Sequence, residues 1–401
     1  MSRARLKLSA FVLAAAVLGT ACGGGGDGET APTTVPEYNV DEGVGSSAAD
    51  LRTDVTTLLQ EHALLVGLAS ATSIGGGDPA PVTAVLDQNS AALGDLITGL
   101  YGAPAGPAFL DAWRRHAAGL LAFAAVAPSG DKAAMDKARN DLLPIQGEIA
   151  ATLNTANPQL TKEGVGEALD GYARGLQTAI TAQAKDDEAA FSKLKEAVDE
   201  MAAPAMVLTA GIVKFRPDDF KGAYDGIGAA MRAELSSKLQ EHTYLAGVAG
   251  ATVVAGADSE GVTDAMEENS LELSRAFGTV YGDEAQDQFL GLWRQHIDLV
   301  LDFAAAARAN DAAGMTRARG DLDAYRSAFG AFLSKANPNF AARDVERALG
   351  VHVDSLLAAV TAEAAQDPAR VAKLKEAAGH MPETGLYLAT GIARQFPAKF
   401  G

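Results

Sequence analysis

The sequence predicts an all-α protein built as two tandem six-helix domains, each about three antiparallel helical hairpins. The first observation is a duplication: Leu59-Gln60-Glu61-His62 recurs as Leu239-Gln240-Glu241-His242, 180 positions later, and this offset holds almost to the C-terminus. The second is composition, since 48% of the residues are hydrophobic but only 6% are aromatic, which is typical of helices rich in small and aliphatic side chains. The third is periodicity: apolar residues recur at steps of three and four, and no alternating strand pattern is present.

Helix-ending residues divide the first copy into its elements. The glycines at 75–77 and Pro79 end a first helix that begins near residue 48, and Pro81 begins a second that runs to about residue 101. A third helix is expected over 108–127. Because the connections are short, neighbouring helices should run antiparallel.

Three more helices follow in the first copy. They are expected from residue 131 to Asn157, from after Thr161 to about residue 184, and from 188 to 215. Pro144 and Pro204 fall inside the fourth and sixth helices and should kink them. The second copy repeats the pattern, so the two domains are expected at 48–222 and 228–401.

The N-terminal segment has the layout of an export signal. Residues 1–21 combine a basic start, an apolar stretch and small residues, and Cys22, the only cysteine, follows directly. This arrangement resembles a bacterial lipoprotein signal, which implies a diacylglyceryl group on Cys22. The alternative is an ordinary signal peptide with an incidental cysteine. Residues 22–47 are rich in Gly, Thr and Pro and predict a flexible tether. We therefore expect an exported protein anchored to the outer face of the cell membrane.

Charge restricts the partners. The formal net charge is −18, and an acidic surface repels phosphate backbones, which argues against nucleic acid as a partner. The same charge disfavours binding to anionic lipid, so membrane attachment should be through the N-terminal lipid.

Histidines on apolar helix faces are the candidate site residues. The first, third and fifth helices of the second copy place His242, His296 and His352 at one register. Three neutral imidazoles with one open position would suit zinc or copper, and two opposed imidazoles could hold a haem. The alternative is that they are hydrogen-bonded core residues. The first copy repeats the pattern less completely, with His62, His116 and Tyr172.

Two pairs of polar residues accompany the histidines, Glu61 and Glu241, and Asn89 and Asn269. Each glutamate precedes its histidine and so lies about 100° away around the helix, too far to share an ion. We expect the glutamates to pair with a base such as Arg114 or Arg294, or to orient a histidine of a neighbouring helix. Each asparagine could fix a histidine tautomer or bond only to backbone.

A resemblance adds to this pattern. The Glu-His dipeptides and the endings Gly211-Ile212-Val213-Lys214-Phe215-Arg216-Pro217 and Gly391-Ile392-Ala393-Arg394-Gln395-Phe396-Pro397 resemble a group of uncharacterised bacterial helical proteins with a Gly-Ile-Val-Lys-Gln-Phe-Pro-like ending. Some members carry the label acetylglutamate kinase. That activity would need alternating strands and helices with phosphate loops, which this sequence lacks.

Together these features predict a lipid-anchored, extracytoplasmic helical protein that acts as a binding or scaffold module. Binding of a transition metal or haem through the core histidines is the alternative, and a histidine-dependent enzyme is the third hypothesis. The sequence carries no HExxH, no GxSxG and no cysteine after residue 22, so the usual motifs of hydrolases and thiol enzymes are missing.

Overall fold

The regular elements of the described residues are all helices, so the predicted all-α fold is confirmed. The computed structural model describes residues 43–400. The predicted signal peptide, Cys22 and the tether up to residue 42 lie outside the described residues. No helix within residues 43–400 is long and apolar enough to span a bilayer.

The helices follow one another in two matching series. The first half contains α1 (Ser47–Ile74), α2 (Ala80–Tyr101), α3 (Ala105–Val126), the short 3-10 helix η1 (Ala127–Ser129), α4 (Lys132–Ala156), α5 (Lys162–Gln183), α6 (Ala190–Asp199) and α7 (Ala202–Phe215). The second half contains α8 (Ile227–Ala255), α9 (Glu260–Tyr281), α10 (Asp283–Arg308), α11 (Ala312–Ala336), α12 (Ala342–Ala364), α13 (Arg370–Gly379), α14 (Met381–Gln395) and α15 (Pro397–Phe400).

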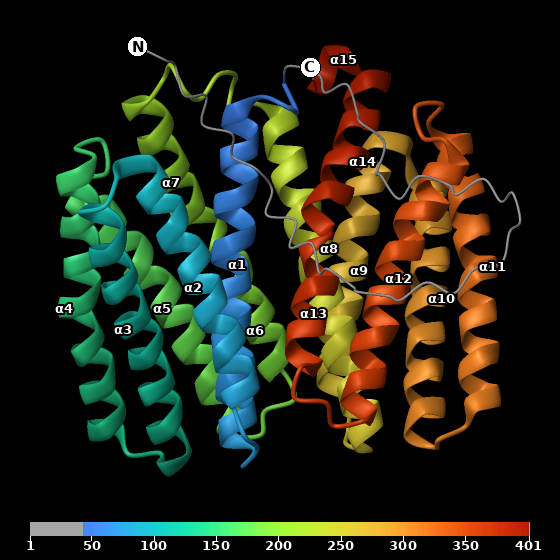
Figure 1. The fold of residues 1–401 in the computed structure, drawn as a ribbon, viewed down its shortest axis with the longest axis horizontal. Helices are drawn as coiled ribbons and strands as arrows, with labels where there is room; N and C mark the ends of the chain where they lie inside the picture. The colour runs from blue at the N-terminus through green and yellow to red at the C-terminus, as the bar shows by residue number, and fades with distance from the viewer. Residues whose placement is uncertain (1–42, 401) are drawn as a thin grey trace, which may run out of the picture. The chain divides into compact units, whose positions relative to one another are not determined.

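The two halves pack through their first helices. Figure 1 shows α1 and α8 next to each other between the remaining helices of each half. On either side of this pair, α6 contacts α9 and α13 contacts α2. Because α6 is equivalent to α13 and α2 to α9, the same contact forms twice across the interface. All described residues belong to one compact unit. Val44, which the sequence placed in the tether, is buried in the core of the second half.

Two helix boundaries differ from the sequence prediction. The third helix begins at Ala105 instead of residue 108, and the predicted sixth helix is two helices, α6 and α7. Pro204 lies in the first turn of α7, where a residue without a backbone N–H is tolerated, and the break falls just before it. In contrast, α4 continues through Pro144.

The repeated Ala-Asn-Pro motif joins the end of α4 to two other helices. Asn157 ends α4, and its side-chain amide donates to Tyr101 Oη at 2.9 Å and to the Gly211 carbonyl at 3.0 Å. Asn337 makes the same two bonds in the second half, to Tyr281 and Gly391. The motif therefore has a structural role, because one buried amide links the α4 corner to α2 and α7.

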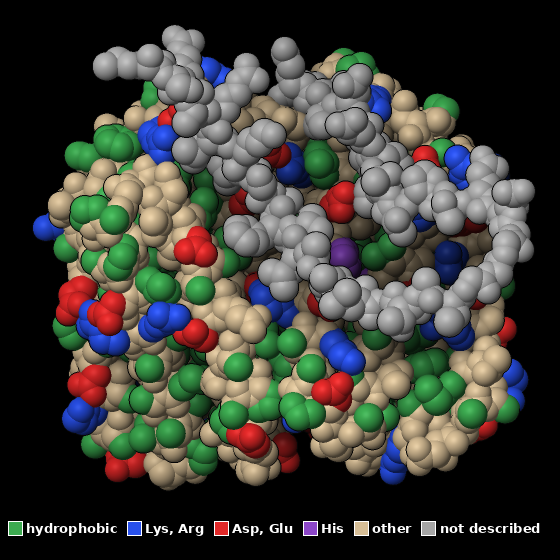
Figure 2. Space-filling model, in the orientation of Figure 1, with side chains coloured by type: hydrophobic (Ala, Val, Ile, Leu, Met, Phe, Trp, Pro, Cys, Tyr) green, Lys and Arg blue, Asp and Glu red, His purple; other side chains and the backbone are tan. Residues whose placement is uncertain are grey.

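Acidic and basic side chains are interspersed over the face shown in Figure 2. Many of them form exposed pairs, such as Arg114 with Asp87 at 2.6 Å and Arg115 with Glu148 at 2.6 Å. Exposed pairs of this kind contribute little to stability. The bases proposed for the glutamates, Arg114 and Arg294, thus bind surface carboxylates instead: Arg294 pairs with Glu267.

The interface between the halves buries two glutamates beside the cations of the opposite half. Glu61 on α1 accepts hydrogen bonds from Lys375 Nζ at 2.6 Å and Tyr244 Oη at 2.6 Å, both from the second half. Glu241 on α8 lies 3.8 Å from Lys195 Nζ of the first half. Lys195 and Lys375 occupy equivalent positions of the two copies, so these contacts between the halves are reciprocal, but Glu241 also lies 3.3 Å from Lys238 of its own half.

Lys195 should be the more important of the two lysines for stability. Its side chain is 4% exposed and contacts Asp199 at 2.8 Å and Glu272 at 2.6 Å as well as Glu241. Lys195→Met leaves these carboxylates with only Lys238 nearby, so we expect the free energy of unfolding, measured in urea, to fall by about 3–5 kcal/mol.

Lys375→Met is the matched control. The Lys375 side chain is 25% exposed, and Glu61 keeps its bonds to Asn89 and Tyr244 without it. This variant should lose only about 1–2 kcal/mol. Equal losses from the two variants would contradict the assigned difference in burial.

Candidate metal centre

The structure brings the three predicted histidines of the second half together. His242 lies on α8, His296 on α10 and His352 on α12, and all three are buried. One nitrogen from each ring lies within 4.8 Å of the others, and the Nε2 atoms of His242 and His296 are 3.1 Å apart. Within residues 43–400, no other group of three histidine, cysteine or acidic side chains is close enough to share an ion.

Helix packing explains this convergence. Each histidine lies on the apolar stripe of its helix, and α8 packs against both α10 and α12. The ring centroids of His242 and His296 are 5.1 Å apart, and those of His242 and His352 are 6.1 Å apart. Facing helices at ordinary packing distance therefore place the three rings at one level.

The second-half histidines are not fully hydrogen-bonded core residues. Nδ1 of His242 and Nδ1 of His352 have no hydrogen-bond partner within the protein, and neither does the neighbouring Trp293 Nε1. Buried polar atoms of native proteins nearly always have a partner, and each one left unpaired costs about 1–3 kcal/mol. The cluster therefore has spare donor and acceptor capacity for a ligand.

Burial keeps these imidazoles neutral. Desolvation lowers the pKa of His296 to about 3 and that of His352 to about 4. It also lowers the pKa of His242 well below its usual value, and the nearby His296 and His352 add to this shift. A neutral imidazole has the free lone pair that a metal ligand requires, so all three rings are in the ligating form near neutral pH.

The first half arranges its equivalent residues differently. His62 and His116 are buried on α1 and α3, and Tyr172 on α5 replaces the third histidine. Trp113 Nε1 donates to His62 Nδ1 at 3.2 Å, so one histidine nitrogen of this half is already used. Burial raises the pKa of the Tyr172 phenol well above its usual value, which makes it a poor metal ligand.

The supporting residues predicted from the sequence lie in the interface between the halves and do not touch the histidines. Asn89 Nδ2 donates to Glu61 Oε2 at 2.8 Å and to the Leu58 carbonyl at 3.0 Å. Asn269 makes the corresponding bonds to Glu241 and to the Lys238 carbonyl. Each asparagine thus orients a glutamate, which neither sequence interpretation anticipated. The 100° rotation separates the two residues of each Glu-His pair as expected.

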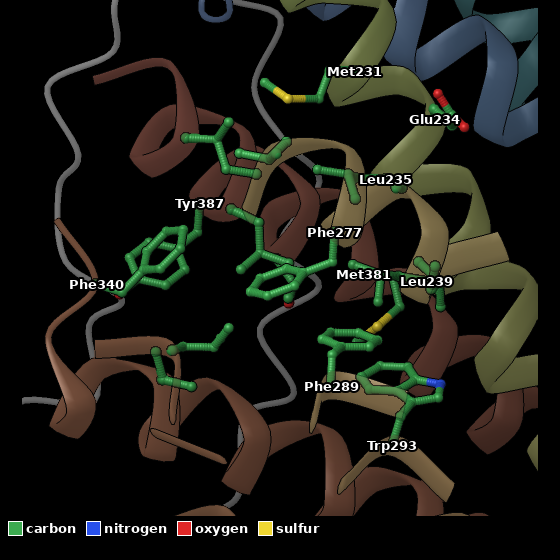
Figure 3. A pocket seen from close by; sticks show the side chains of 18 of the residues that line it. Met231, Glu234, Leu235, Leu239, Phe277, Phe289, Trp293, Phe340, Met381 and Tyr387 are labelled. Carbon is green, nitrogen blue, oxygen red and sulfur yellow. The ribbon is translucent and has the colours of Figure 1, made fainter. Parts of the chain in front are cut away.

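An apolar cavity, which was not predicted from the sequence, lies beside the histidines. It has a volume of about 370 Å³ and is lined by residues of α8, α9, α10, α11, α12, α14 and α15, including His242, His352 and Trp293. Figure 3 shows Phe289 and Trp293 on one side of this cavity and Phe340 and Tyr387 on another. A sequence signal existed: the second copy has aromatic residues where the first has aliphatic ones, as at Phe277 and Ile97.

Comparison with known proteins gives no further guide to the site: no family model, curated protein or solved structure matches the chain. The resemblance to uncharacterised bacterial helical proteins stays a prediction. The duplication offers an internal comparison instead, because one fold carries two versions of the same positions.

Acid should destabilise the protein through its buried histidines. An unfolded histidine has a pKa of about 6.5, whereas burial lowers the folded-state pKa of His116 and of His352 to about 4. The unfolded chain therefore binds more protons as the pH falls below 6.5, and stability that is complete above this pH is lost progressively toward pH 4. We expect the urea midpoint to fall steeply between pH 7 and pH 4.5.

A histidine without hydrogen bonds gives a direct check of this cause. Neither ring nitrogen of His116 has a partner, so His116→Leu should move the loss of stability to lower pH. A midpoint that stays constant from pH 7 to pH 5 would show that histidine burial does not control acid stability.

Proposed function

We propose that this protein binds one transition-metal ion, Zn²⁺ foremost, through His242, His296 and His352. The observation that supports this function best is the convergence of three buried, neutral imidazoles whose nitrogens lie within 4.8 Å of one another. This proposal keeps the binding class expected from the sequence and favours the metal alternative over a scaffold without a ligand.

The geometry suits a tetrahedral ion. Zinc–nitrogen bonds of about 2.0–2.1 Å place two tetrahedral ligands about 3.3 Å apart. The His242 and His296 Nε2 atoms, at 3.1 Å, are close to that separation. Small side-chain rotations would bring in His352. The same 3.1 Å separation also suits a hydrogen bond between the two rings, so a metal titration is the deciding measurement.

The spacing fits an ion better than a haem. Two axial imidazoles of a haem iron bind on opposite faces of the macrocycle, with nitrogens about 4 Å apart. The rings of His242 and His296 are in contact, with centroids 5.1 Å apart. The two rings leave no space between them for a porphyrin, whereas a single ion does not require such a space.

The open fourth position would face the apolar cavity. His242 and His352 line this cavity, and His296 is not among its lining residues. Three protein ligands with one open position are the arrangement of zinc sites that bind or activate a further ligand. The cavity also gives the ion a route to a buried site.

The full chain is first treated with a chelator and is then titrated with Zn²⁺ in a calorimeter. This measurement tests the proposed function. We expect one ion per chain. His296→Gln should weaken binding on the order of 100-fold or more, because loss of a ligand should exceed the 10- to 100-fold effect of removing an outer-shell partner. His352→Tyr, which gives the second half the residue found at Tyr172, should behave similarly.

His116→Gln is the matched control, because His116 is the first-half equivalent of His296. This variant should keep the wild-type affinity and stoichiometry. Absence of binding by the wild-type chain, or equal losses from His116→Gln and His296→Gln, would contradict a metal site in the second half.

We also propose that the chain is exported and held at the membrane by a lipid on Cys22. This part is supported only by the sequence of residues 1–22. Cys22→Ser should move the protein from the membrane fraction to the soluble extracytoplasmic fraction, because it removes the sole acceptor of the lipid. Fractionation of cells followed by immunodetection measures this, and a variant that stays with the membrane would rule out the anchor.

A further inference from the structure

The cavity beside the histidines has the size and lining of a small-molecule site. Its volume of about 370 Å³ lies at the lower end of the range for ligand pockets of about 300–1,000 Å³. Most of its lining is apolar, and its polar side chains are few: Glu234, His242, Thr279, His352, Thr384, Tyr387 and Lys399. Apolar walls with a few polar groups are typical of sites that bind small organic molecules.

Aromatic rings form much of the lining. Phe277 lies 5.1 Å from Phe289, and Phe289 lies 5.2 Å from Trp293, in stacked arrangements. On another side, the ring centroids of Phe340 and Tyr387 are 5.4 Å apart (Figure 3). Rings at these distances interact favourably in offset or tilted geometry, and an aromatic ligand between the two groups could extend the same contacts.

The first half shows that the fold does not need these aromatic residues. Phe277, Phe329, Phe340 and Tyr387 correspond to Ile97, Ile149, Leu160 and Val207. The first three of these aliphatic side chains are buried in the core of the first half. Four changes from aliphatic to aromatic around one cavity therefore belong to the second half alone, as does the third histidine.

The entrance of the cavity also differs from the equivalent positions of the first half, here in the exposure of the side chains. Met231 and Leu235 line the cavity and are partly exposed. Their first-half equivalents, Leu51 and Val55, are each 1% exposed. The second half is thus open at the position where the first half is closed.

The exposure of the lining residues shows which end of the cavity opens to solvent and which end is buried. Ile227, Glu234 and Lys399 are exposed and mark the mouth, whereas His242 and His352 are buried at the inner end. The mouth carries one acidic and one basic side chain, so it favours neither sign of charge. An uncharged ligand fits this mouth, and a single polar atom on it would meet the imidazoles.

We propose that this cavity binds a small, uncharged aromatic molecule whose polar atom reaches the His242 and His352 end. The identity of the polar partner rests on the proposed function: with a metal bound, the polar atom takes the open fourth position, and without metal it hydrogen-bonds to an imidazole. The aromatic contacts are independent of the metal.

Two probes with equal numbers of non-hydrogen atoms test the preference for a ring. 2-Naphthol and 1-decanol contain the same numbers of carbon and oxygen atoms, but only the first is aromatic. Calorimetric titration of the wild-type chain should show 2-naphthol binding about tenfold more tightly than 1-decanol. Equal affinity for the two probes, or no binding of 2-naphthol, would overturn the proposal whatever the variants show.

Variants that restore first-half residues locate the binding. The double change Phe277→Ile and Phe340→Leu should weaken 2-naphthol binding about tenfold, because each lost ring contact removes part of the aromatic preference. Phe303→Leu is the control, since Phe303 is a buried aromatic residue of α10 outside the cavity. Equal affinities of the double variant and the control would place the probe elsewhere and overturn the proposal.

Repeating the titrations with Zn²⁺ present and with a chelator separates this proposal from the metal site. If both proposals hold, Zn²⁺ should tighten 2-naphthol binding but leave naphthalene, which lacks the polar atom, unchanged. Aromatic preference without any Zn²⁺ binding would support the cavity and overturn the metal function. Zn²⁺ binding without aromatic preference would support the metal function and overturn the proposal for the cavity.

Discussion

The reciprocal burial of two glutamates between the halves is the constraint on which the rest of the structure depends. Glu61 and Glu241 are 4% and 3% exposed, on the two helices that form the centre of the protein. An isolated buried carboxylate is very unfavourable, so each needs a cation close by. Lysines of the opposite half supply much of that charge. Each half therefore places a lysine beside the glutamate of the other half, and Lys238 of the second half itself lies closest to Glu241, at 3.3 Å. These contacts favour one register of α1 against α8.

This register also sets the direction of the histidines. Because adjacent residues on a helix point about 100° apart, a glutamate that faces the opposite half turns its neighbouring histidine toward the core of its own half. His62 and His242 thus face equivalent cores, where α3 and α10 bring in His116 and His296. In each Glu-His dipeptide, the glutamate therefore lies in the interface between the halves and the histidine lies in the core of its own half.

Within this shared framework, the halves have diverged in their cores. The first has a tyrosine as the third member, a tryptophan hydrogen-bonded to His62, and aliphatic side chains in the space between the helices. The second has a third histidine, more aromatic rings and a cavity of about 370 Å³. A cavity removes packing contacts and so reduces stability. The third histidine and the cavity are thus features of the second half.

The sequence by itself determined the helices, the duplication and the histidine register, because these depend on local periodicity and on capping residues. Asp131 and Thr161 accept hydrogen bonds from the first turns of α4 and α5, and Asn157 ends α4, as the residue types indicate. Only the tertiary structure decided which cations meet the glutamates and where space remains between the helices. Lys375 reaches Glu61 across 314 residues of chain, and local pattern carries no information on such a pair. A cavity likewise depends on how seven helices fill a volume together, so no single helix sequence reveals it.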